Sequence, residues 1–224
     1  MPKIFLSLTL CLLTAFLRAE PAPSADEILD SVRLRQSQQQ VDLRGQLRQN
    51  NLIVPFELVQ SGSLIRYIFS NPSETLQLQI GEKDSRLEEV TGAGVEKVSP
   101  AQFDHKVRST DVTYEDLALK FLYWPDAQVV GSDNIRTRSC WKLQLSSPNQ
   151  KSQYGHVLLW VDKSGGALMR MEGYDNTGQL TKRFEVVSAQ KIDNRWFLKQ
   201  MRIEQFQAGT KHVQSRTYLE IKNR

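Results

Sequence analysis

The chain has 224 residues, of which 29 are basic and 25 acidic, and 40% are hydrophobic. This length supports one domain with a substantial core. The net charge of +4 is spread along the chain rather than grouped, which argues against a nucleic-acid-binding surface and predicts an ordinary solvated polar face.

Residues 1–19 have the pattern of an export signal. Lys3 gives a positive start, residues 4–17 form an apolar run, and Ala19 is a small residue at a suitable cleavage point. The run is too short to span a bilayer comfortably, so we expect a cleaved signal peptide rather than a membrane anchor. The predicted product is a single exported domain, residues 20–224.

The cysteine content fits an exported domain without disulfides. Cys11 lies inside the apolar run, and the preceding Leu10 is too large for a lipidation motif, so we do not expect a lipoprotein. Cleavage near Ala19 leaves Cys140 as the one remaining cysteine. Such a domain must be stabilised by packing.

The first third of the domain predicts one helix and six strands. Ser24 and Glu27 have the spacing of a capping box, and apolar residues at helical spacing continue the helix to about Gln40. Strands are then expected near residues 41–47, 52–60, 63–69, 76–80, 86–90 and 95–98, where the apolar period changes to two. Pro55 places an edge or a bulge in the second of them.

The central segment, residues 100–126, is expected to be mainly helical. The sequence Thr113-Tyr-Glu-Asp116 is a helix start signal, and Pro125 ends the helix. Apolar side chains follow at i, i+3, i+4, i+7 and i+8, which predicts an amphipathic helix. These are Tyr114, Leu117, Ala118, Phe121 and Leu122.

The last hundred residues predict a sheet. Strands are expected at residues 128–130 and 140–145, then in three runs between residues 154 and 186, and at 196–207 and 213–221. Turns at residues 162–166 and 175–178 make the three middle runs an antiparallel meander. Both faces of the first run are apolar: Val157, Leu159 and Val161 on one, Leu158 and Trp160 on the other.

These elements indicate an α+β protein dominated by antiparallel sheet. About ten or eleven strands in one sheet should curl strongly or close. A curled sheet with an apolar concave face, covered by an amphipathic helix, leaves a hollow for side chains or an acyl chain. Candidate residues for the wall of such a ligand cavity are Trp141, Leu158, Trp160, Met169, Met171, Phe184 and Val186, with Phe121 and Leu122 on the lid.

The sequence offers no support for catalysis. His105, His156 and His212 lie far apart without metal-ligand spacing, and no nucleophile motif or phosphate-binding loop is present. Cys140 has no flanking basic residue and is expected to be a buried, small apolar group. Glu115 and Asp116 are attributed to the helix N-terminus. We therefore expect neither an enzyme nor a cofactor or metal.

Several segments resemble the LolA-like family of outer-membrane lipoprotein-sorting proteins, and in particular its branch of single-domain exported proteins. The order of elements also agrees over nearly the whole mature chain. The matching segments are Thr113-Tyr-Glu-Asp-Leu117, Phe121-Leu-Tyr-Trp-Pro125, Cys140-Trp-Lys-Leu-Gln-Leu145, Tyr154 through Lys163, and Leu168 through Gly178.

The resemblance implies an incomplete antiparallel barrel around a hydrophobic cavity covered by a helical lid. It implies a soluble periplasmic carrier that takes acyl chains of lipoproteins, or another lipid, from an inner-membrane transporter to an outer-membrane acceptor. In the family's carriers an arginine just before an early proline holds the lid. Here Pro72 follows Asn71, so this latch is expected to be missing or different.

Two other functions remain open from the sequence. Related folds bind a membrane-anchored anti-sigma factor, which makes an envelope-stress or regulatory sensor with a membrane protein partner the main alternative. A lipid-modifying enzyme is the third reading, although no nucleophile–base pair supports it.

Overall fold

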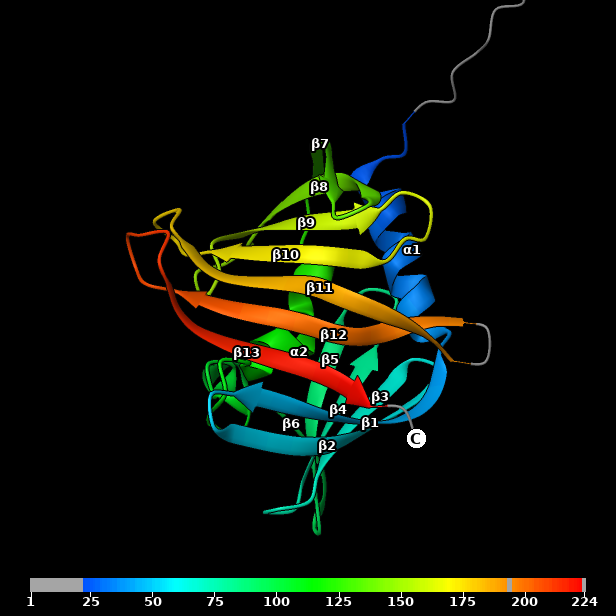
Figure 1. The fold of residues 1–224 in the computed structure, drawn as a ribbon, viewed down its shortest axis with the longest axis vertical. Helices are drawn as coiled ribbons and strands as arrows, with labels where there is room; N and C mark the ends of the chain where they lie inside the picture. The colour runs from blue at the N-terminus through cyan, green and yellow to red at the C-terminus, as the bar shows by residue number, and fades with distance from the viewer. Residues whose placement is uncertain (1–21, 193–194, 223–224) are drawn as a thin grey trace, which may run out of the picture.

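The computed structural model describes residues 22–192 and 195–222, and thirteen strands in those ranges form one antiparallel sheet (Figure 1). This confirms the α+β class, with more strands than the ten or eleven expected. The strands are β1 (Gln40–Gln49), β2 (Leu52–Ser61), β3 (Leu64–Phe69), β4 (Glu74–Ile80), β5 (Ser85–Thr91), β6 (Gly94–Lys97), β7 (Gln128–Ile135), β8 (Arg138–Ser146), β9 (His156–Asp162), β10 (Leu168–Tyr174), β11 (Leu180–Ile192), β12 (Arg195–Phe206) and β13 (Val213–Lys222).

Two meanders make up the sheet. Strands β1 to β6 run outward in one direction and β13 to β7 in the other, and pairing of β1 with β13 joins the halves. The sheet curves strongly but does not close, so β6 and β7 form its two edges. Pro55 pairs with Gln46 of β1 but precedes the β2–β3 ladder, which begins at Phe56. This is the edge-like position expected of a proline.

Helix α1 (Ala25–Ser37) begins at the predicted capping box. The Ser24 Oγ accepts a hydrogen bond from the Glu27 backbone N–H at 3.2 Å, and the Glu27 carboxylate accepts from the Ser24 N–H at 2.8 Å. The helix ends at Ser37 rather than near Gln40, because Gln40 already belongs to β1. Its buried residues Ala25, Ile28, Leu29 and Val32 pack on the side of the sheet where α2 (Tyr114–Ala118) also lies, behind the sheet in Figure 1.

The central segment is far less helical than predicted. It contains three short 3₁₀ turns, η1 (Pro100–Gln102), η2 (Val107–Ser109) and η3 (Lys120–Tyr123), besides the five-residue α2. Thr113 does cap α2 as expected, but Leu119 adopts a left-handed conformation with φ 51° and ends it after Ala118. The apolar side chains at helical spacing do pack in the interior, but the prediction of one continuous helix was wrong.

The turn at Leu119 divides the central segment between two apolar cores. Residues before it pack in a first core with β1 to β5, whereas Phe121, Leu122 and Trp124 pack in a second core with α1 and β8 to β10. Leu119, Tyr123 and Phe184 contact both cores. The interior is consequently one continuous apolar layer under a bent covering segment.

A buried ion pair fixes α2 to the sheet. The Lys182 ammonium on β11 donates to the Asp116 carboxylate at 2.7 Å, and both side chains are only 3% exposed. The same carboxylate accepts hydrogen bonds from the Thr113 backbone N–H at 2.8 Å and from the Tyr154 hydroxyl at 2.6 Å. A charge this deeply buried is tolerated when its partners are all in place.

Tyr154 reaches Asp116 because Gly173 leaves room for its ring. A Cβ atom on Gly173 would lie 2.2 Å from the Tyr154 Cε1 atom, so any larger residue there would displace the ring. Burial, followed by the nearby Asp116, raises the pKa of Tyr154 well above its usual value. The hydroxyl thus remains a hydrogen-bond donor to the carboxylate.

No helix within residues 22–192 and 195–222 is long and apolar enough to cross a membrane. The predicted signal peptide and its Cys11 lie outside the described residues. Cys140 is fully buried, and burial raises the pKa of its thiol, which confirms the prediction of a structural cysteine.

Removing either partner of the buried pair should strongly destabilise the protein. Lys182→Met or Asp116→Asn leaves the other group uncompensated, and each should lower the free energy of unfolding by about 3–5 kcal/mol. The double variant should lose less than the sum of the two single losses, because neither unpaired charge then remains. Urea unfolding of the four proteins measures this coupling.

The exposed pair Arg44–Glu57 supplies the matched control. Its side chains are 69% and 47% exposed, and its atoms lie 3.6 Å apart. Glu57→Gln should change the unfolding free energy by about 1 kcal/mol or less. Single losses at Asp116 and Lys182 no larger than that at Glu57 would contradict the assigned role of the buried pair.

Candidate functional site

The first core contains a small cavity of about 20 Å³. It lies between the concave face of the sheet and the central segment, and it offers no room for a ligand larger than a water molecule. Eight side chains from both layers surround it: Leu47, Phe56, Tyr67, Phe69 and Leu219 on the strands, and Val107, Val112 and Leu117 on the central segment.

Aromatic rings form the floor of this cavity. The Phe56 ring lies 6.4 Å from that of Tyr67 and 6.1 Å from that of Phe69, between ring centroids. Gly45 permits this arrangement, since a Cβ atom there would lie 2.6 Å from the Phe56 ring. Burial raises the pKa of Tyr67 to about 12, so the floor stays uncharged at neutral pH.

Polar contacts attach the central segment at one rim of the cavity. The Arg108 guanidinium forms an ion pair with Glu74 at 2.8 Å, donates to the Pro72 carbonyl, and lies over the Phe69 ring. The Tyr114 hydroxyl donates to the same Glu74 carboxylate at 2.8 Å. Asn71, and not an arginine, precedes Pro72 in the sequence. Arg108 of the central segment instead contacts the β3–β4 turn.

Further polar contacts hold the segment from other sides. Glu115 accepts from the Ser152 hydroxyl and, at 2.9 Å, from the Gln153 backbone N–H in the β8–β9 loop. Burial raises the pKa of Glu115, and these two hydrogen bonds oppose the shift. The Lys120 ammonium donates to Asp84 at 2.7 Å in the β4–β5 turn. The cover is therefore held by polar contacts at its edges and by the buried Asp116–Lys182 pair, with apolar contacts between them.

Three of the predicted cavity residues face this interior. Trp141, Met171 and Phe184 pack in the second core, and Phe184 also contacts the first. Val186 is partly buried and pairs with Met201 of β12. The lid residues Phe121 and Leu122 are 5% and 3% exposed and pack in the second core.

The other three predicted residues require a correction. Leu158, Trp160 and Met169 pack with Ile135 and Cys140 in a separate cluster. That cluster lies on the opposite face of the sheet, because Val157, Leu159 and Val161 alternate with them and face the second core.

A bulge explains the placement of Met169. The pairing of β10 with β9 shifts between Leu168 and Arg170, so Met169 and Met171 do not share a face as strict alternation predicts.

Most residues around the cavity were not singled out from the sequence. Leu47, Phe56, Tyr67 and Phe69 belong to correctly predicted strands in the first half of the chain, and their alternation was the available signal. Lys182 was also missed, although it shares the inward parity of Phe184. A lysine at an inward position of an apolar strand would have indicated a buried partner.

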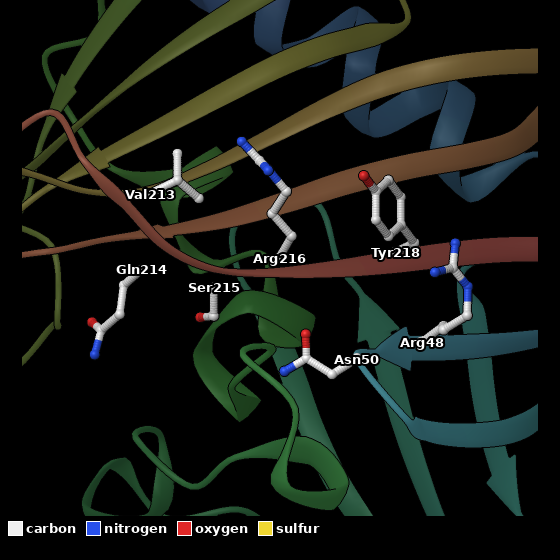
Figure 2. Close-up of a pocket in the computed structure, with 7 residues that line it drawn as sticks. All are labelled: Arg48, Asn50, Val213, Gln214, Ser215, Arg216 and Tyr218. Atoms are coloured by element: carbon white, nitrogen blue, oxygen red, sulfur yellow. The ribbon is translucent and has the colours of Figure 1, made fainter.

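A second, larger depression lies at the seam of β1 and β13. It has a volume of about 340 Å³, and Figure 2 shows mostly polar side chains around it. Its two arginines already hold carboxylates, Arg48 with Glu220 at 2.7 Å and Arg216 with Glu204 at 2.9 Å. We regard it as a solvated groove rather than a ligand site.

Three solved structures share this fold over most of their length. A DUF1329 family protein from Desulfovibrio piger superposes with a TM-score of 0.65 at 20% identity, over 89% of this chain and 91% of that one. A putative outer membrane lipoprotein-sorting protein domain from Vibrio parahaemolyticus gives 0.68 at 15% identity, over 89% and 90%. A LolA superfamily protein from Nitrosomonas europaea gives 0.62 at 15% identity, over 90% and 93%.

At these identities the likeness shows the fold, which is LolA-like as the sequence motifs predicted. Comparison with curated protein sequences gives no match. A family model described as "Uncharacterized protein"-like matches residues 93–224, more than half of the chain, so the chain belongs to that family and adopts the LolA-like fold.

Proposed function

We propose that this protein is an exported, non-enzymatic carrier that holds acyl chains of lipoproteins, or another lipid, beneath the central segment. The observation that carries this proposal is the contrast between the two layers. The contacts of Val107, Val112 and Leu117 with the sheet are apolar, whereas the contacts that hold the segment at its rim are polar. Apolar contacts exchange for an acyl chain without leaving a polar group unpaired.

In this proposal the conformation with a 20 Å³ cavity is the closed state of the carrier. Pockets for small ligands usually span about 300–1,000 Å³, far more than the 20 Å³ found here. Loading therefore requires the central segment to move away from the sheet. The opened space would extend from the first core past Phe184 towards Trp141 and Met171. These three residues of the predicted cavity wall therefore belong to the proposed site.

The energy available from burial is sufficient for a carrier. Each buried CH₂ contributes about 0.8 kcal/mol, so a chain of about ten methylenes gains about 8 kcal/mol before the costs of opening. A net gain of about 8 kcal/mol would correspond to micromolar binding without any specific polar contact, and longer chains gain more to offset the cost of opening. Such an interior would accept chains of varied length.

Location and partners follow from the same proposal. The signal-like residues 1–19 would direct the protein to the periplasm. The likeness to a putative outer membrane lipoprotein-sorting protein domain supports a lipoprotein cargo bound for the outer membrane, and an inner-membrane donor and an outer-membrane acceptor are part of the proposal. Recovery of a membrane protein partner in place of a lipid would favour the sensor alternative.

Filling the cavity should block ligand binding. Leu117 lines the cavity and is only partly buried, so Leu117→Trp adds bulk there without emptying the core. We expect a fluorescent fatty acid to bind this variant at least about tenfold more weakly than the wild type, a loss of about 1.4 kcal/mol. Fluorescence titration measures the affinity.

Leu34→Trp is the matched control, because Leu34 is 57% exposed on α1, outside both cores. It should bind the probe like the wild type. Unchanged affinity in a folded Leu117→Trp protein would place the ligand elsewhere.

Weakening the Arg108 rim should speed ligand exchange. Arg108→Ala removes the ion pair with Glu74 and the contact with the Pro72 carbonyl, but no residue of the cavity wall. The free energy of the closed state relative to the open state should rise by about 1–2 kcal/mol. The exchange rate of a bound fluorescent fatty acid should then rise by about five- to thirtyfold. Stopped-flow displacement by unlabelled fatty acid reports this rate.

Arg86 on β5 is exposed and provides the control. Arg86→Ala should leave the exchange rate unchanged. Equal rates in wild type, Arg86→Ala and Arg108→Ala would show that the Arg108 rim does not gate the interior.

A further inference from the structure

The β11–β12 hairpin extends past its neighbouring strands. The β10 ladder with β11 stops at Glu185, and the β13 ladder with β12 stops at Gln200. From Ser188–Gln200 to Ile192–Arg195, β11 and β12 pair with each other. At about 3.3 Å per residue this hairpin arm, residues 188–192 and 195–200, projects roughly 13 Å, and it is the orange extension at the right of Figure 1.

The arm carries the most exposed large apolar side chain among the described residues. Trp196 is 69% exposed, and the Lys191 ammonium lies 5.3 Å from its ring centroid. Phe197, next to it, is partly buried beneath the Arg195 guanidinium at 5.8 Å. A single exposed apolar ring is common on protein surfaces, but Trp196 is distinctive because it lies on a projecting arm among basic side chains.

The charge around Trp196 defines the kind of partner. Residues 188–200 contain three basic side chains, Lys191, Arg195 and Lys199, and one acidic residue, so the arm has a net charge of 3 − 1 = +2. All three basic residues are exposed. Neither the depression at the β1–β13 seam nor the cavity of the first core is lined by a described residue of the arm.

We propose that the hairpin arm docks the protein on an anionic membrane surface, with Trp196 at the headgroup level and the three cations among the lipid phosphates. Tryptophan favours the membrane interface because its ring is apolar and its N–H is polar. Each nearby cation adds attraction to anionic lipid. This inference goes beyond the proposed carrier function and does not require the interior to hold a lipid.

Vesicle binding tests the arm directly. The protein contains four tryptophans, of which Trp124 and Trp160 are buried and Trp141 is partly buried, so a blue shift in emission on binding reports mainly Trp196. We expect binding and a blue shift with phosphatidylcholine vesicles that contain about one third phosphatidylglycerol. Binding should weaken as salt is added, because exposed charges are screened.

Two variants separate the contributions of the ring and the cations. Trp196→Ser should weaken vesicle binding by about tenfold, from the loss of a buried apolar side chain. Lys191→Glu with Arg195→Glu should weaken it more than twentyfold, at about fivefold for each cation removed. Ile53→Ser, which removes a side chain 57% exposed on β2, and Lys97→Glu, on the edge strand β6, are the matched controls and should bind like the wild type.

The outcomes also distinguish this proposal from the carrier function. A wild type that fails to bind anionic vesicles, or binds them no better than the arm variants, overturns the docking proposal while leaving fatty-acid binding untouched. Self-association that disappears in Trp196→Ser, without vesicle binding, would instead assign the arm to a second copy of the chain. Vesicle binding lost only in arm variants that still bind fatty acid would support both proposals.

Discussion

The buried ion pair between Asp116 and Lys182 is the interaction on which the arrangement of the interior depends. A lysine on the inward face of an apolar strand needs a counter-charge, and that counter-charge comes from the first turn of α2. The pair thereby fixes where the central segment crosses the sheet. Tyr154, seated over Gly173, and the cap at Thr113 complete the hydrogen bonds of the carboxylate.

Two ion pairs that hold the central segment differ in their access to water. The Asp116–Lys182 pair is 3% exposed on both sides, whereas Arg108 and Glu74 are 13% and 27% exposed. Water reaches the second pair more readily and can replace its contacts at lower cost. The opening that we propose for ligand entry therefore begins at the Arg108 rim, while α2 stays anchored and the apolar layer beneath is uncovered from one side.

Sequence periodicity predicted the strands well but located the interior poorly. Alternation correctly divided Leu159 from Trp160 on β9, yet both faces were apolar and nothing in the sequence said which one the helices cover. The bulge before Arg170 then reversed the expected side of Met169. Leu119 broke a helix that its neighbours' spacing favoured, since its left-handed conformation is set by tertiary packing in two cores.

Native mass spectrometry of the protein recovered from the periplasm without detergent tests the central claim most directly. A carrier predicts a mass above that of the polypeptide, released on activation as an acylated molecule, and this excess should fall in Leu117→Trp. A bare polypeptide mass that persists after incubation with excess fatty acid would contradict the account. Recovery of a bound membrane-protein segment in place of a lipid would favour the sensor function instead.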